Sequence, residues 1–348
     1  MRLLELDGLR AVAVMMVFVA HSGVALPGGG LGVDIFFAIS GYIITRLLLG
    51  EIDKTGTISI RKFYKKRIVR LWPALFALLL CFLIIEIFFR TFFGEWDSRG
   101  LLAIGVVAVS ALNYVRALEL GSGGILGHTW SLAVEEQFYL IWPAALLALG
   151  KISLKRAVFL LLFAAALIAL WRAWLGMTGS WWYAYHALET RADGLIFGAL
   201  LAMIGAHKFH RFVPLWPLPF AYIAFLSING FGWDSAFMLL GGHSLVAISS
   251  AWLVCACVLP NSPFRVTLGS KVATWIGDRS YSLYLWHYPV LAFVNDTDLP
   301  SWITFCLGLV ASVVISDISI RFIEHPIRKR FSPNDQHSMQ RTFLRHEA

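Results

Sequence analysis

Two ionisable side chains lie inside the first apolar stretch of the chain, at a spacing that places them on one face of a helix. Arg10 and His21 are eleven residues apart within the segment 9–26. At 100° per residue, this spacing returns His21 to within about 20° of Arg10 and separates the two by roughly 16 Å along the axis. Ionisable groups at membrane depth are costly, so they usually face the protein interior and mark a pathway or a reaction site. The alternative is that Arg10 extends to the lipid headgroups and that His21 is an interfacial residue.

Further polar side chains interrupt later apolar segments, and several are expected near the same membrane surface as His21. These residues are Asp34, His128, Ser131, Glu135, Glu136, Glu189, Arg191 and Asp193. A neutral imidazole can take a proton from a hydroxyl group while a carboxylate orients it, so His21 with Asp34 or Glu135 could act as a general base. The same groups could instead relay protons in a transporter. Asp34 and Glu135 could also form purely structural ion pairs with Arg191 or His21.

Metal and disulfide chemistry are not indicated by the sequence. No H-E-x-x-H or comparable ligand spacing is present, so no metal is expected. All four cysteines lie in apolar segments, and Cys255 and Cys257 would face away from each other on a helix. His287 lies in another apolar segment, where it could be a polar helix break with internally satisfied hydrogen bonds.

The composition is typical of a polytopic membrane protein. The chain has 348 residues, of which 58% are hydrophobic and 14% are charged, whereas soluble proteins carry about 25% charged residues. Its mean hydropathy is +0.71. We therefore predict one all-α integral membrane domain over residues 1–330 and a short polar, disordered cytoplasmic tail over residues 331–348. The net charge of +8 arises from short basic loops, which favours a role in membrane orientation over nucleic-acid binding.

Apolar windows of about 17–25 residues predict about ten transmembrane helices. A shorter apolar segment near 101–115 is predicted to be re-entrant or interfacial rather than to cross the membrane. The loop that contains Arg67 and Arg70 is strongly basic and should face the cytoplasm. With ten crossings the other basic loops and both termini also face the cytoplasm, whereas an eleventh crossing would place the termini on opposite sides.

Several sequence motifs, taken together and in order, resemble those of the acyltransferase 3 family of membrane acyltransferases. The resemblance begins with residues 6–11 and His21 and continues through residues 32–42. The segment 63–73 is similar to the family's basic motif with two arginines three residues apart. The later landmarks are residues 129–139, 191–194, 281–287 and 324–326. The resemblance extends from about residue 3 to residue 330.

This resemblance implies that the protein is an O-acyltransferase. Members of the family move acetyl or a related short acyl group from acyl-coenzyme A to a hydroxyl group, often on a cell-envelope sugar and sometimes on a small molecule. The family's essential histidine and the arginine eleven residues before it correspond to His21 and Arg10. The two-arginine motif, associated with the acyl-CoA donor, corresponds to Arg67 and Arg70. The resemblance further implies a bacterial inner membrane, while the short polar tail gives no sign of the esterase-like domain that some members carry.

A mechanism that fits both lines of reasoning can be stated as a hypothesis. Acyl-CoA, most simply acetyl-CoA, would meet Arg67, Arg70 and Arg10 on the cytoplasmic side, because guanidinium groups pair with phosphates. The pantetheine arm would follow the first helix toward His21, which would deprotonate an acceptor hydroxyl arriving from outside, with Glu135 or Asp34 orienting it. Direct transfer and an acyl-enzyme route both remain open, as does the oligomeric state. The rival interpretations are a proton-coupled transporter or exporter of a glycan or lipid-linked substrate, and a sensor or scaffold without turnover.

Overall fold

The chain is folded entirely into helices and connecting turns wherever its structure is described. The computed structural model describes residues 3–24, 26–93, 98–232, 235–297 and 299–331. These ranges contain no strand, and the predicted all-α architecture is therefore confirmed. Apart from Phe331, the tail predicted over residues 331–348 lies outside the described residues.

The helical elements follow one another with short connections. In chain order they are α1 (Leu4–His21), η1 (Gly29–Leu31), α2 (Gly32–Thr55), α3 (Ile60–Phe93), α4 (Ser98–Ala108), α5 (Leu112–Ala117), η2 (Gly124–Thr129), α6 (Trp130–Leu149), α7 (Leu154–Met177), α8 (Trp181–His186), α9 (Leu188–Arg191), α10 (Asp193–Ile204), η3 (Ala206–Leu215), α11 (Pro217–Ile228), η4 (Met238–Gly242), α12 (His243–Val258), α13 (Lys271–Asn295), α14 (Ser301–Ser319), η5 (Ile320–Glu324) and α15 (His325–Phe331). Two of the η elements, η4 and η5, are single π-helical turns.

Six helical stretches in the described part of the chain are long and apolar enough to cross a membrane. They are Gly29–Thr55, Ile60–Phe88, Gly124–Leu149, Leu154–Met177, Met238–Val258 and Ser301–Phe331. A seventh crossing is added if η3 and α11, which are bent by 66°, form one span. The structure thus supports a multi-pass membrane protein, whereas the ten crossings and the cytoplasmic termini predicted from the sequence are not confirmed. One reason for the difference is that α1 carries Glu5, Asp7 and Arg10 within 18 residues, which lowers its hydropathy.

The segment near residues 101–115 does not form one long helix. It is divided between α4, with 11 residues, and α5, with 6 residues. Ser110, between them, has a φ of 54°, a value that interrupts a right-handed helix. A helix of this length extends only about 17 Å, less than the apolar core of a bilayer. The shape of the segment is compatible with the re-entrant or interfacial placement predicted for it.

One end each of α2 and α13, two long helices around the site, is fixed by a local sequence signal. The Ser270 hydroxyl accepts a hydrogen bond of 3.3 Å from the backbone N–H of Ala273, which caps the first turn of α13. At the C-terminal end of α2, Gly56 has a φ of 75°. It ends the helix in the left-handed conformation that glycine readily adopts. These two signals define where α2 ends and where α13 begins.

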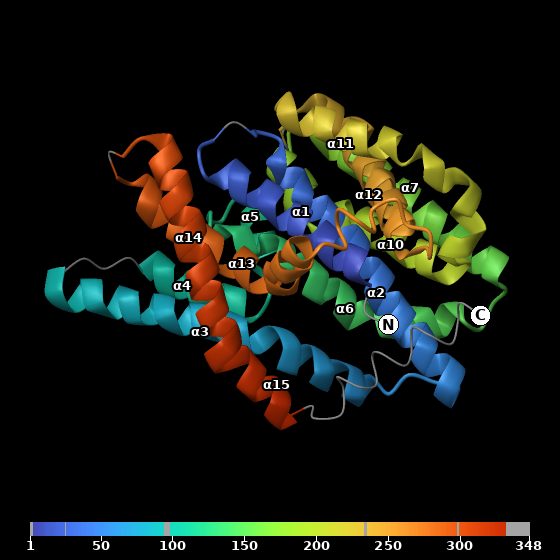
Figure 1. Cartoon of the computed structure of the whole chain (residues 1–348), viewed down its shortest axis with the longest axis horizontal. Coiled ribbons are helices and arrows are strands. Elements are labelled where there is room, and N and C mark those ends of the chain that lie inside the picture. The colour runs from blue at the N-terminus through green and yellow to red at the C-terminus, as the bar shows by residue number, and fades with distance from the viewer. Residues whose placement is uncertain (1–2, 25, 94–97, 233–234, 298, 332–348) are drawn as a thin grey trace.

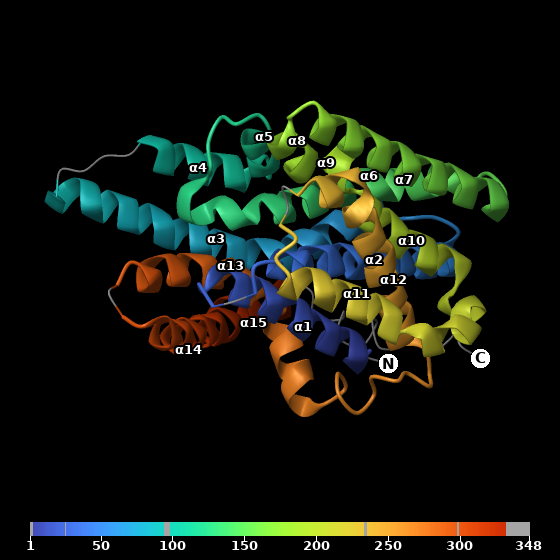
Figure 2. The ribbon, with the colours of Figure 1, turned by 90° about the horizontal axis from the view of Figure 1, so that it is seen from above.

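Helices α1 and α2 lie in the middle of the molecule. In Figure 2, α7 runs along one edge of the molecule and α14 along the opposite edge, with α2 between them. Figure 1 shows α3 and α4 reaching outward together on the side away from α7. Burial follows this arrangement: 56% of the apolar window of α2 is buried, against 22% for α7. Asp7 of α1 and Asp34 and Thr45 of α2 are therefore enclosed by protein, while α3 and α7 are suited to contact lipid.

Two glycines allow the central helices to approach at backbone distance. A Cβ atom placed on Gly41 of α2 would lie 2.0 Å from the carbonyl oxygen of Leu195 in α10, so only glycine permits this close helix packing. A Cβ atom on Gly277 of α13 would lie 1.8 Å from the carbonyl oxygen of Asp7 in α1. This second contact fixes the register between α1 and α13, the two helices that carry the histidines described below.

Candidate functional site

A cavity of about 910 Å³ opens between the first turns of α1 and α3 and the neighbouring parts of α2, α6, α13 and η5–α15. Its lining is rich in charge and has an excess of basic groups. The basic residues are Arg10, Lys66, Arg67, Arg70, Arg328 and Lys329, and the acidic residues are Asp7, Glu135, Asp278 and Glu324. The volume lies within the range of cavities that bind small molecules and cofactors, about 300–1,000 Å³. The cavity is therefore suited to an anionic ligand of that size.

The two arginines of the basic motif face this cavity from one side of α3. Their spacing of three residues places them on the same helical face. The guanidinium group of Arg67 lies over the Tyr139 ring, 4.3 Å from its centroid. Arg70 is surrounded by three further guanidinium groups, those of Arg10, Arg67 and Arg328. Within the described part of the chain, neither Arg67 nor Arg70 forms an ion pair with a carboxylate.

The other two arginines of the cavity are held by carboxylates. Arg10 donates a hydrogen bond of 3.0 Å to Asp7. Arg328 donates a hydrogen bond of 2.6 Å to Glu324, which also accepts a hydrogen bond from Ser282 of α13. Arg10 and Arg328 are thus fixed in place, whereas Arg67 and Arg70 keep donors for a ligand that is not part of the chain.

Glu135 lies on the cavity wall and accepts two hydrogen bonds from hydroxyl groups. Ser40 of α2 donates at 3.0 Å, and Tyr139, one helical turn further along α6, donates at 2.7 Å. Because the Arg67 guanidinium lies over the Tyr139 ring, Glu135 contacts the basic motif through Tyr139. The structure brings Glu135 together with Arg67, and it shows no hydrogen bond between Glu135 and His21.

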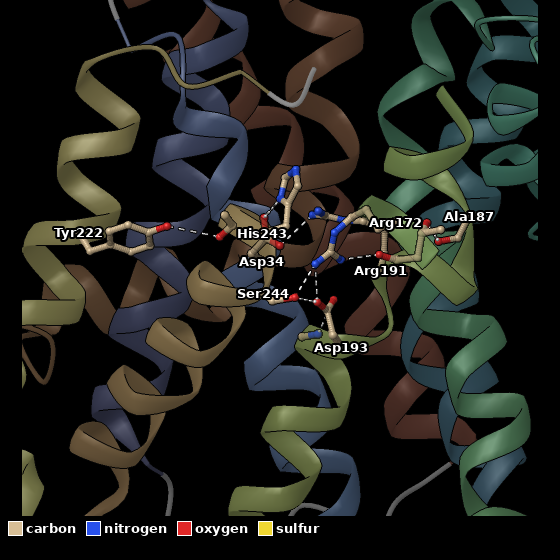
Figure 3. Close-up of polar contacts among 11 residues, drawn as sticks. Asp34, Arg172, Ala187, Arg191, Asp193, Tyr222, His243 and Ser244 are labelled. Atoms are coloured by element: carbon tan, nitrogen blue, oxygen red, sulfur yellow. Dashed lines mark hydrogen bonds and ion pairs between the residues drawn. The ribbon is translucent and has the colours of Figure 1, made fainter. Parts of the chain in front are cut away.

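Asp34 lies outside the cavity, in a second cluster of buried ion pairs (Figure 3). It accepts a hydrogen bond of 2.8 Å from Arg191, and the His243 ring nitrogen Nδ1 is 4.0 Å from its other oxygen. This pairing is the structural alternative considered from the sequence. Asp34 has no hydrogen bond to His21.

A neighbouring ion pair in the same cluster joins α7 to α10. Arg172, with no exposed side-chain surface, donates hydrogen bonds of 2.9 Å to Asp193 and 2.6 Å to the carbonyl oxygen of Thr190. Ser244 of α12 also donates to Asp193, at 2.7 Å. Sequence reasoning missed Arg172, although a single arginine near the end of the apolar segment 157–175 is the signal that could have found it.

His21, at the last turn of α1, faces the protein interior and contacts a second histidine. Its Nδ1 is 3.0 Å from Nε2 of His287 in α13, and the two ring centroids are 5.2 Å apart. The side chain of Asn295 donates a hydrogen bond of 3.1 Å to the carbonyl oxygen of His21. Since Gly277 meets Asp7 at the other end, α1 and α13 run parallel, and this alignment brings His287 to His21.

A third histidine completes the cluster around His287. The His128 ring is 5.4 Å from the His287 ring and stacks on Tyr288 with a centroid distance of 5.2 Å. Nε2 of His128 is 3.1 Å from the carbonyl oxygen of Leu285, so it donates a hydrogen bond to that oxygen. The cluster has no carboxylate ligand: among the residues with described placement, no group of three His, Cys, Asp or Glu could hold a metal ion.

Tyr284 connects the cavity with the histidine cluster. It lines the cavity together with Ser131, and its ring is 5.5 Å from that of His287, one helical turn further along α13. The Tyr284 hydroxyl donates to the carbonyl oxygen of His128 at 2.9 Å and lies 2.6 Å from the Ser131 hydroxyl. His21 itself does not line the cavity. The cavity therefore does not extend to His21, and Tyr284 is a cavity-lining residue that contacts both His128 and His287.

Comparisons with known proteins match nearly the whole chain. The family model described as an acyltransferase domain matches residues 3–321. The O-acetyltransferase OatA of Staphylococcus aureus is 32% identical over 97% of this chain and 60% of its own length. The peptidoglycan O-acetyltransferase OatA of Listeria monocytogenes is 33% identical over 93% of this chain and 56% of its own length. The chain thus spans less than two thirds of these relatives. No solved structure matches it.

Proposed function

We propose, from the premise that this chain belongs to the acyltransferase 3 family, that it moves an acetyl or similar short acyl group from acyl-CoA to a hydroxyl group. The relatives that match nearly all of the chain are named O-acetyltransferases, and one of them is named for peptidoglycan. By this likeness, the acceptor is a cell-envelope carbohydrate. A bacterial cytoplasmic membrane, with the cavity on its inner side, is the corresponding location.

The observation that carries the proposal is the cavity with the two unpaired arginines of α3. Phosphate groups of a coenzyme would satisfy the guanidinium groups of Arg67 and Arg70, which no carboxylate neutralises in the described residues. Arginine binds phosphate through two parallel hydrogen bonds, which orient the ligand as well as attract it. Glu135 supports this arrangement, because it holds Tyr139 under the Arg67 guanidinium.

The acyl end of the donor would lie toward Tyr284, at the part of the cavity nearest the histidines. His21 accepts the proton of the acceptor hydroxyl, whose oxygen attacks the thioester carbonyl carbon. The tetrahedral intermediate then releases the coenzyme A thiolate, which takes the proton from the His21 imidazolium. For these groups to meet, the Ser131–Tyr284 contact has to separate during the reaction.

The experiment that tests this function measures free thiol and acylated product with purified protein, acetyl-CoA and a soluble glycan fragment. Wild-type protein should release one thiol per acyl group transferred, and His21→Ala should abolish both. Movement of a substrate across proteoliposomes without release of thiol would instead establish a transporter. Mass spectrometry of envelope glycans from cells with and without the gene would identify the acceptor.

A matched control separates loss of chemistry from loss of folding. His186 is buried like His128 and His287, with 1% of its surface exposed, but it contacts Trp182 and not His21. His186→Phe should retain transfer activity at a folded yield comparable to that of His21→Ala. Full activity in His21→Ala would refute the role of His21 as the base.

A further inference from the structure

The contacts of His287 determine which nitrogen of His21 is available for catalysis. We infer that His287 is a positioning residue that holds His21 as the Nδ1–H tautomer and leaves Nε2 of His21 as the basic atom. The inference rests on the proposed function, because it assigns a role to the partner of the proposed base. It is carried by a chain of hydrogen bonds whose donors and acceptors can be assigned one after another.

The first step is the protonation of His287 at Nδ1. This nitrogen lies 2.7 Å from the carbonyl oxygen of Tyr284 and 3.2 Å from that of Leu283. Carbonyl oxygens only accept hydrogen bonds, so Nδ1 of His287 must carry the hydrogen. Both acceptors belong to the preceding turn of the same helix, and they therefore stay in place as long as α13 is folded.

The second step is the neutral state of His287. The side chain has no exposed surface, and all of its hydrogen-bond partners in the described part of the chain are the two carbonyl groups and His21. An imidazolium at this position would be a buried charge without a carboxylate partner, which is strongly unfavourable. Because Nδ1 carries the only ring proton, Nε2 of His287 has a free lone pair.

The third step transfers this assignment to His21. Nδ1 of His21 is 3.0 Å from Nε2 of His287. Because Nε2 of His287 carries a lone pair and no hydrogen, Nδ1 of His21 must donate the hydrogen. In the neutral ring the proton is then absent from Nε2, which becomes the atom that can accept a proton from a hydroxyl group. Within the described residues, Nε2 of His21 forms no hydrogen bond, so it is not occupied by another group of the chain.

His287 also stabilises the state that follows proton uptake. When His21 becomes an imidazolium, its Nδ1–H still donates to His287, and the hydrogen bond becomes charge-assisted. Besides Phe18 and Tyr284, which face His287, the rings nearest the pair are His128 from η2, 5.4 Å from His287, and Tyr288 from α13, 4.8 Å from His21, as centroid distances. Neither supplies a competing acceptor at Nδ1 of His21, so His287 alone sets the orientation.

The test combines kinetics with a spectroscopic measurement of the tautomer, both on the full chain in detergent micelles or nanodiscs. His287→Phe removes the acceptor and keeps a ring, whereas His287→Gln keeps an acceptor at the position of Nε2. For metal-binding histidines, loss of the partner that orients the ring reduces activity by about 10- to 100-fold, and we take this range as the scale for His21. We expect a decrease of this size in kcat for His287→Phe, an unchanged KM for acetyl-CoA, and at least partial recovery of kcat in His287→Gln. His186→Phe is the matched control and should leave kcat unchanged.

Nitrogen NMR of protein labelled with ¹⁵N-histidine distinguishes protonated from bare ring nitrogens directly. The His21 signals, assigned by their loss in His21→Ala, should show a protonated Nδ1 and a bare Nε2 in the wild-type protein. In His287→Phe this pattern should shift toward the opposite tautomer.

A protonated Nε2 in the wild-type protein would overturn the inference whatever the activity of the variants, as would equal kcat values for His287→Phe and wild type. Full activity of His21→Ala would instead remove the proposed function. Failure of the proposed function can be distinguished from failure of the inference on His287, because the NMR measurement of the His21 tautomer does not require enzyme turnover. If His287→Phe does not fold, the wild-type spectrum and His287→Gln still decide the question.

Discussion

The replacement of Arg70 by glutamine should weaken donor binding without weakening the fold. Arg70 faces the cavity beside three other guanidinium groups and has no carboxylate partner in the described residues. Glutamine removes the positive charge, so the hydrogen bond that Arg70 would give to a donor phosphate is lost. Hydrogen bonds to charged groups contribute about 1.5–3 kcal/mol. Since about 1.4 kcal/mol corresponds to a factor of ten, the affinity for acetyl-CoA should fall by about 10- to 100-fold.

The stability of the empty protein should change in the opposite direction. No ion pair is broken by Arg70→Gln, and the repulsion from Arg10, Arg67 and Arg328 is relieved. The melting temperature without ligand should therefore be equal to or higher than that of wild type. Arg10→Gln provides the contrast, because it breaks the 3.0 Å contact with Asp7 and should lower both stability and affinity.

The assay is isothermal titration of the purified protein with acetyl-CoA, together with the KM for the donor and thermal unfolding in the same detergent. Arg321→Gln is the charge-matched control: its side chain is 66% exposed, pairs with Asp317 and does not line the cavity. Donor affinity of the wild type should also weaken with ionic strength more steeply than that of Arg70→Gln. The reasoning is refuted if Arg70→Gln leaves donor affinity at the wild-type value, or if only the KM of the acceptor changes.

Three further predictions concern the fold around the site. Arg172→Met should destabilise the protein by about 3–5 kcal/mol, because it leaves the buried Asp193 carboxylate without its cation, and the double variant with Asp193→Asn should recover much of the loss in thermal unfolding. Gly277→Ala should lower both the melting temperature and activity because its Cβ atom would lie 1.8 Å from a backbone oxygen of α1, whereas Gly105→Ala, with open space around it, should be neutral or mildly stabilising; equal melting temperatures for the two variants would contradict the close contact. Burial lowers the pKa of His186 to about 3, so His186 takes up a proton first in the unfolded chain as the pH falls below about 6.5, and this residue alone should lower the free energy of unfolding by about 1.4 kcal/mol between pH 7.5 and pH 5.5; a His186→Phe variant with the same pH dependence as wild type would disprove this assignment.

Parts of the site could be predicted from local sequence pattern because they depend on neighbouring residues of one helix. The shared face of Arg67 and Arg70 follows from their spacing, and the close approach at Gly41 follows from the absence of a side chain. The structural pairing of Asp34 with Arg191 was one of the alternatives that charge alone suggested. Each of these inferences needed only helix geometry or the rule that buried charges are paired.

The remaining contacts depend on which helices pack together, and the local sequence pattern does not reveal that packing. His21 and His287 are 266 positions apart, and only the parallel alignment of α1 with α13 brings them into contact. The role of Tyr284 was missed for the same reason, because it is far in sequence from the other residues of the site. It lies one helical turn before His287 and contacts both the cavity and the histidines. The ten crossings predicted from the sequence are not confirmed: six helical stretches of the described residues, or seven with the bent pair, are long and apolar enough to cross a membrane, and charged residues near the start of α1 lower its hydropathy.

The hydroxyl contact between Ser131 and Tyr284 has a consequence for the cell as well as for the reaction. A continuous wet channel through an energised bilayer would conduct protons and dissipate the electrochemical gradient. Under the proposed function, a cavity that stops short of His21 would leave no continuous water-filled path between the two faces of the membrane in this state. Tyr284, which lines the cavity and contacts His287, would form part of that barrier.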